Sequence, residues 1–192
     1  MLFRSEAGID RSTIGFLSWV GLAYGFKWVW SPLVDRLPLP LLHAGLGRRR
    51  SWLVVAQCAI VVGLVGMALT DPQGELETVV GFALLVAFAS ATQDIALDAY
   101  RIESADTQHQ AALAATYQTG YRLAMIWSGA GVLWIAAWFA GSDSTTYQHA
   151  AWQTAYLVMA ASMGLGLLTV LLSPEPTAAD LPKARSVREW LQ

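Results

Sequence analysis

Five long apolar segments, separated by short polar stretches, dominate the pattern of hydrophobic and polar positions along the chain. About 20 predominantly apolar residues, wound as a helix, cross the roughly 30 Å hydrocarbon core of a bilayer. The segments lie at residues 14–34, 52–69, 79–100, 111–140 and 151–172. The pattern therefore predicts an all-α polytopic membrane protein with five transmembrane helices and a bundle spanning residues 14–173.

The polar stretches carry turn-forming residues and most of the positive charge. Eight of the 12 Lys and Arg residues lie after the first segment, after the third segment or in the tail; these are Arg36, Arg48, Arg49, Arg50, Arg101, Lys183, Arg185 and Arg188. The positive-inside rule places them in the cytoplasm, residues 1–13 outside, and residues 174–192 at the start of a cytoplasmic linker. An external N-terminus without a signal peptide leads us to expect a further helix upstream.

Composition agrees with a membrane protein and excludes several functions. Hydrophobic residues make up 55% of the chain and charged residues 14%, against about 25% charged in a soluble domain. The net charge of −2 excludes the basic face of a nucleic-acid-binding protein. Cys58 is the single cysteine, and the three histidines lack ligand spacing, so we expect no metal and no cofactor. No nucleophile elbow or phosphate loop occurs, so no enzyme is expected.

Four charges fall inside or near the apolar segments: Lys27, Asp94, Asp98 and Arg122. An Asp at the centre of a membrane helix costs about 2.5–3.5 kcal/mol on insertion scales, and such residues usually mark ion or substrate pathways. Asp94 and Asp98 are four residues apart, so they share one helix face close to Gln93. The alternative is that the two carboxylates lie near the interface and cap a helix.

Depth predicts contact within part of this set. Counted from Asp35 and Arg101, Lys27 and Asp94 both lie roughly 10–12 Å from the cytoplasmic boundary. The two positive and two negative charges could neutralise one another on burial. The partner of Arg122 stays open, because it depends on where the turn before the fourth segment is centred.

Polar and aromatic side chains precede Arg122 in the fourth segment. Tyr117, Gln118 and Tyr121 could form a wall that binds a sugar or a peptide through aromatic surface and amide hydrogen bonds. The alternative is an interfacial belt of tyrosines, which many membrane helices carry. The sequence leaves both interpretations open.

Two stretches resemble a known transporter family. Residues 26–36 read FKWVWSPLVDR, and residues 47–53 read GRRRSWL; together they resemble the loop between helices two and three of major facilitator transporters. Residues 90–99 read SATQDIALDA and resemble helix four of the same superfamily. Within it, the resemblance is to the AmpG-type muropeptide permeases, with acetyl-CoA transporters of the endoplasmic reticulum as the nearest competitor.

The resemblance implies a fold of twelve helices in two six-helix halves, with a site open alternately to each side. This chain would then be an incomplete six-helix half, containing helices two to six and lacking helix one and the C-terminal half as partners. The implied function is proton-coupled import of anhydro-muropeptides, which are sugar-peptide fragments, for peptidoglycan recycling. The implied location is the bacterial inner membrane, with the proton gradient as the energy source.

The resemblance also implies roles for single residues. Asp94 and Asp98 become candidates for proton coupling or for contact with a substrate amine, and Lys27 and Arg122 for carboxylate contact or as counter-ions. A cytoplasmic gate would contain Asp35, Arg36, Arg48, Arg49 and Arg50. The alternative for these arginines is topology signalling alone.

Other functions remain open on the sequence. One is an acetyl-CoA-type or other solute transporter of the same superfamily. Another is a truncated membrane protein that does not transport, since five helices cannot supply two pseudo-symmetric halves.

Overall fold

The computed structural model describes residues 25–104, 106–141 and 147–176, and every regular element in these ranges is a helix. This confirms the all-helical prediction for the described part of the chain. Four helical stretches there are long and apolar enough to cross a membrane; they are Arg48–Leu69, Leu76–Glu103, Gln110–Ala140 and His149–Leu172. The predicted segment 14–34 lies partly outside the described residues, and its described end belongs to helix α4.

The helices follow one another through short connections. Their bounds are α4 Lys27–Arg36, α5 His43–Leu46, α6 Arg48–Leu69, α7 Leu76–Glu103, α8 Gln110–Ile126, η2 Trp127–Gly131, α9 Val132–Ala140 and α10 His149–Leu172. Each of α6, α7, α8 and α10 begins before its predicted apolar run, because the neighbouring polar residues continue the helix. Two expectations are corrected: Arg48, Arg49 and Arg50 form the first turn of α6 instead of a loop, and Arg101 lies inside α7.

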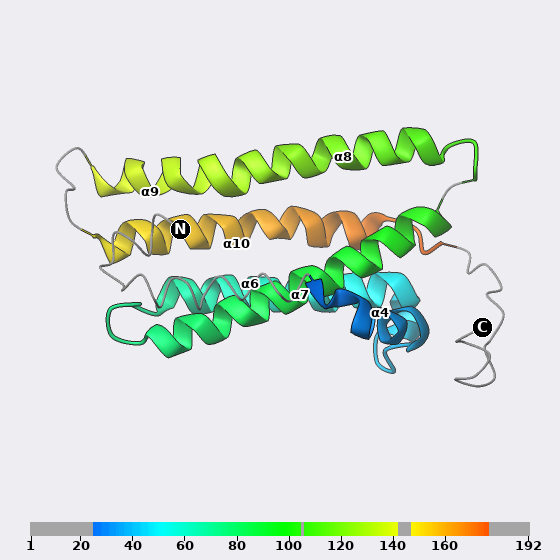
Figure 1. Cartoon of the computed structure of the whole chain (residues 1–192), viewed down its shortest axis with the longest axis horizontal. Helices are drawn as coiled ribbons and strands as arrows, with labels where there is room; N and C mark the ends of the chain where they lie inside the picture. The colour runs from blue at the N-terminus through cyan, green and yellow to red at the C-terminus, as the bar shows by residue number, and fades with distance from the viewer. Residues whose placement is uncertain (1–24, 105, 142–146, 177–192) are drawn as a thin grey trace.

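The bundle is arranged around α6 and α10 (Figure 1). Helix α6 packs against both α7 and α10, α9 packs against α10, and α4 packs against α7. Figure 1 shows α8 and α9 as one long rod that runs beside α10. This arrangement brings the ends of α4, α7 and α10 to the start of α6.

Small residues allow α6 and α7 to approach closely. The buried positions of α7 include Val79, Ala83, Ala87 and Ala91, which recur every four residues and form one stripe. On α6, Gly63 lies against α7, and a Cβ atom there would be 3.2 Å from the backbone oxygen of Phe82. Close packing through small residues is a common way for membrane helices to associate.

Two apolar clusters hold the bundle together. The first joins α9 to α10 and contains Ile135, Ala136, Trp152, Ala155 and Met159. The second joins α4, α6, α7 and α10 and contains Val34, Leu53, Ile95, Ala96 and Val170. The second cluster lies next to the charged residues of the candidate site, since Val34 precedes Asp35 in α4.

Helix α8 has a different environment from α9. No side chain of α8 is buried against the described residues, whereas α9 buries Ile135 and Ala136. Between them, η2 is a π-helical turn, which widens the helix locally. Helix α8 is therefore held by a few side-chain contacts and by its continuity with α9.

Candidate functional site

A lysine, an aspartate and a tyrosine from three helices, each partly buried, meet between α4, α7 and α8; we call them the intramembrane cluster. The ammonium of Lys27 on α4 forms an ion pair with Oδ2 of Asp94 on α7. The hydroxyl of Tyr117 on α8 donates a hydrogen bond to Oδ1 of Asp94 over 3.3 Å. One carboxylate thus contacts both α4 and α8, and the contact expected between Lys27 and Asp94 is present.

Neighbouring contacts set the register of α4 against α7. The indole N–H of Trp30 donates to the hydroxyl of Thr92 over 3.2 Å, and its ring lies 5.2 Å from that of Phe88. Lys27 precedes Trp30 by about one helical turn, and Thr92 is two residues before Asp94. The pairing of Trp30 with α7 therefore places the Lys27 side chain beside the Asp94 carboxylate.

Asp98 has a partner on its own helix. Its Oδ1 lies 3.5 Å from Nη2 of Arg101, three residues further along α7. The guanidinium of Arg101 also lies over the ring of Tyr117, 4.9 Å from its centroid, within the range of a cation–π interaction. Asp98 therefore borders the intramembrane cluster through Arg101 without joining it.

The remaining intramembrane candidates are only partly gathered. Tyr121 stacks on Tyr117 with ring centroids 6.4 Å apart. The Oε1 atom of Gln93 is buried and has no hydrogen-bond partner among the described residues. Gln118 and Arg122 are exposed, and Arg122 forms no ion pair with the described part of the chain.

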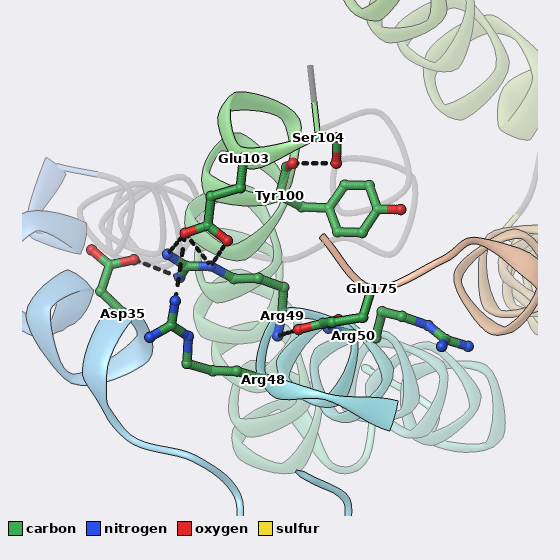
Figure 2. Close-up of polar contacts among 8 residues, drawn as sticks. All are labelled: Asp35, Arg48, Arg49, Arg50, Tyr100, Glu103, Ser104 and Glu175. Carbon is green, nitrogen blue, oxygen red and sulfur yellow. Dashed lines mark hydrogen bonds and ion pairs between the residues drawn. The ribbon is translucent and has the colours of Figure 1, made fainter. Parts of the chain in front are cut away.

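A second group, the arginine cluster, contains Asp35, Arg48, Arg49 and Glu103 (Figure 2). The side chain of Arg49 is only 3% exposed and lies between two carboxylates. Its Nη1 is 2.7 Å from Oδ1 of Asp35, and its Nη2 is 2.6 Å from Oε1 of Glu103. Its Nε also donates to both oxygens of Glu103, over 3.2 and 3.1 Å. A buried guanidinium requires such partners, because an unpaired charge is costly to desolvate.

Arg48 adds a weaker contact to the same group. Its Nη2 lies 3.5 Å from Oε1 of Glu103, the oxygen that also contacts Arg49. Asp35 belongs to α4, the two arginines to α6 and Glu103 to α7. The arginine cluster therefore ties three helices together at one end of the bundle.

Arg50 and Arg36 lie outside the arginine cluster. Figure 2 shows the side chains of Arg49 and Arg50 leaving α6 in opposite directions. Arg50 donates instead to the backbone oxygens of Val170 and Leu171, over 2.9 and 2.6 Å. Arg36 is exposed at the end of α4. Of the five predicted gate residues, three belong to the arginine cluster, Arg50 contacts the end of α10, and Arg36 is exposed.

Two carboxylates of this region were not predicted from the sequence. Glu103 lies beyond the predicted end of the third segment, and Glu175 lies in the predicted linker. The backbone N–H groups of Arg49 and Arg50 donate to Glu175 over 2.8 and 3.1 Å. One feature of the sequence points to such carboxylates. Three consecutive arginines near one boundary need about as many carboxylates when they are buried.

The chain is similar in sequence to proteins named as transporters and permeases. A family model described as acetyl-coenzyme A transporter 1 matches residues 2–74. The anhydromuropeptide permease of Escherichia coli strain K12 is 40% identical over 169 residues, which cover 88% of this chain and 32% of that protein. The protein named "Putative transporter AmpG 4" of Rickettsia felis is 32% identical over 187 residues, covering 97% and 43%. The chain thus spans between about a third and two fifths of the length of these relatives.

Proposed function

Because the chain belongs to the acetyl-coenzyme A transporter/AmpG family of major facilitator transporters, and not to a family of enzymes, we propose that it supplies helices of a proton-coupled importer. The proposed substrate is an anhydro-muropeptide, taken up across the bacterial inner membrane for peptidoglycan recycling. The 40% identity to the anhydromuropeptide permease supports this substrate. The observation that carries the proposal is the intramembrane cluster, in which Asp94 contacts Lys27 and Tyr117.

Asp94 is the proposed proton-coupling residue. When it is ionised, its two oxygens accept from Lys27 on one side and from Tyr117 on the other. A proton on Asp94 removes the charge that attracts Lys27 and turns one oxygen into a donor. The contacts from α7 to α4 and α8 then change together, as coupling of protonation to a helix movement requires.

The substrate is proposed to contact the surface next to the intramembrane cluster. Tyr117, Gln118 and Tyr121 offer aromatic and amide groups on α8, and Gln93 offers a buried oxygen without a partner among the described residues. Arg122 offers a charge for a substrate carboxylate. Asp98, which pairs with Arg101, is assigned to the border of this site.

The arginine cluster is the proposed cytoplasmic gate. It joins α4, α6 and α7 through ion pairs of the buried Arg49, so separating these helices breaks several charge-assisted contacts at once. Glu103 is added to the predicted set of Asp35, Arg36, Arg48, Arg49 and Arg50 on the strength of its contacts with Arg49.

Transport of acetyl-CoA is a second candidate function. The family model described as acetyl-coenzyme A transporter 1 matches residues 2–74, which favours it. The two substrates differ in chemistry, because acetyl-CoA carries phosphates and an adenine, whereas a muropeptide carries sugars and peptide carboxylates. Competition for uptake between the two compounds distinguishes the candidates.

The first prediction concerns Asp94. We expect Asp94→Asn to lower proton-driven muropeptide uptake by about a hundredfold, the low end for a lost proton-transfer group, because an amide carries no titratable proton. The measurement is uptake by E. coli permease whose matching segment is replaced by residues 25–176 of this chain, and by this chain alone. The control is Glu77→Gln, an exposed residue in the first turn of α7. Unchanged uptake and pH dependence in Asp94→Asn contradict the coupling role.

A further inference from the structure

The start of α6 lacks a side-chain cap of its own. Gly47 precedes it, with φ at 82°, and has no side chain that could accept from the first free N–H groups. The carboxylate of Glu175 takes this place, since its two oxygens accept from the N–H groups of Arg49 and Arg50. A negative charge at a helix N-terminus is favourable because of the helix dipole. A residue more than 120 positions away in the chain therefore caps α6.

At the end of α10 the free backbone groups are carbonyls, and they accept hydrogen bonds from a positively charged side chain. The last carbonyls of a helix have no partner within the helix. Arg50 supplies donors to two of them, with its Nε on the oxygen of Val170 and its Nη2 on that of Leu171. A cation at a helix C-terminus is again the favourable charge. The start of α6 is thus capped by Glu175, which follows α10. The end of α10 is capped by Arg50, which belongs to α6.

The segment after α10 is held by further contacts. The hydroxyl of Tyr100 on α7 donates to the backbone oxygen of Pro174 over 2.7 Å. Pro174 and Pro176 flank Glu175 and restrict the backbone, because the proline ring fixes φ. Little room is left at Gly47, where a Cβ atom would overlap the side chain of Glu175. The segment therefore holds the Glu175 carboxylate over the first turn of α6.

We propose that Glu175 and Arg50 form a reciprocal helix clamp that positions Arg49 in the arginine cluster. The backbone N–H of Arg49 is bound by Glu175, while its side chain reaches Asp35 and Glu103 on the opposite side. The clamp thus fixes the point from which the buried guanidinium extends. Glu175 acts through Arg49 and is a positioning residue.

The clamp also brings a third carboxylate to this end of the bundle. The side chains of Arg48 and Arg49 contact Asp35 and Glu103, whereas Glu175 accepts from the backbone N–H groups of Arg49 and Arg50. The contacts of the clamp do not rest on the proposed function. Only its role in positioning a residue of the proposed gate rests on that function.

The test follows hydrogen exchange in the full chain, reconstituted in nanodiscs and observed by ¹⁵N NMR. In Glu175→Gln we expect the amides of Arg49 and Arg50 to exchange at least roughly tenfold faster, because charge-assisted hydrogen bonds are lost. The side-chain Nε–H of Arg49 should also exchange faster, which the loss of a cap alone would not cause. Glu77→Gln, in the first turn of α7, is the matched control and should leave these signals unchanged. Unchanged exchange at Arg49 in Glu175→Gln overturns the clamp.

A second pair of variants serves if Glu175→Gln lowers the yield of folded protein. Gly47→Ala should lower Tm, through overlap with Glu175 and through the positive φ. In the Glu175→Ala background the overlap is absent, so Gly47→Ala should lower Tm by less. Equal decreases of Tm in both backgrounds overturn the contact between Gly47 and Glu175. Uptake is a separate measurement: a clamp found by exchange, together with failure of Asp94→Asn to affect uptake, rejects the proposed coupling and leaves the clamp standing.

Discussion

At the scale of single residues, adjacent arginines on α6 have different energetic roles. Arg49 is buried between two carboxylates, whereas Arg48 keeps 24% of its side chain exposed and contacts Glu103 at 3.5 Å. Removing one partner of a buried ion pair leaves an uncompensated charge, which costs far more than losing a partly exposed pair. Position on the helix, and not residue type, therefore decides what each arginine contributes.

The second prediction compares these two arginines. We expect Arg49→Gln to lower the free energy of unfolding by about 3–5 kcal/mol, because Glu103 and Asp35 lose their buried counter-charge. Arg48→Gln should cost at most about 1 kcal/mol. Denaturant unfolding in mixed micelles, followed by circular dichroism, measures both values. Equal losses in the two variants would show that burial does not distinguish the two arginines.

The sequence predicts the sites only in part. Lys27 and Asp94 could be matched because both depths follow from helical rise, counted from nearby charged residues. The pairing of Asp98 with Arg101 was missed, because Arg101 was expected in a loop, where it would not share a helix face with Asp98. Glu175 was missed because contacts between residues more than 100 positions apart depend on tertiary packing, which hydropathy does not report.

At the scale of elements, the apolar runs located the long helices and underestimated their lengths. Hydropathy detects the part of a helix suited to hydrocarbon, while the hydrogen-bonded helix continues into the polar residues on either side. The first turn of α6, with three arginines, and the last turn of α7, with Arg101 and Glu103, are such extensions. These extensions carry Arg48, Arg49 and Glu103 of the arginine cluster.

The third prediction concerns the packing of α6 on α7. Gly63→Ala places a methyl group against Val86 and the backbone oxygen of Phe82, so we expect a loss of about 1–3 kcal/mol from overpacking. Gly81 on α7 faces open space, so Gly81→Ala should be neutral or slightly stabilising. Thermal unfolding of both variants in the same micelles makes the comparison. A larger loss of stability in Gly81→Ala than in Gly63→Ala would contradict the close packing of Gly63 against α7.

At the scale of the whole molecule, the charge distribution sets an orientation across the membrane. The described loop between α6 and α7 contains no Lys or Arg, whereas the opposite ends of these helices carry the arginine cluster. The positive-inside rule then predicts that the arginine cluster faces the cytoplasm. The intramembrane cluster lies deeper, between this end and the centre of the bundle.

The fourth prediction tests this orientation with single cysteines. Cys58 is the one native cysteine, so Cys58→Ser provides an unreactive background. In intact cells, a membrane-impermeant maleimide should label Gln73→Cys, in the loop between α6 and α7. It should label Asp106→Cys, between α7 and α8, only after the membrane is permeabilised. The reverse pattern would invert the orientation.

The arginines at the start of α6 are also made before two of the carboxylates that bind them. Arg48, Arg49 and Arg50 leave the ribosome before Glu103 and Glu175, which emerge with the end of α7 and after α10. The positive-inside rule therefore predicts that the arginines anchor the cytoplasmic side of the chain while the helices next to them insert. Once α7 is in place, the charge of Arg49 is paired with Glu103, and once α10 is in place, Glu175 accepts from the backbone N–H of Arg49. The arginines that are predicted to orient the nascent chain thus become part of the contacts that join the helices of the finished one.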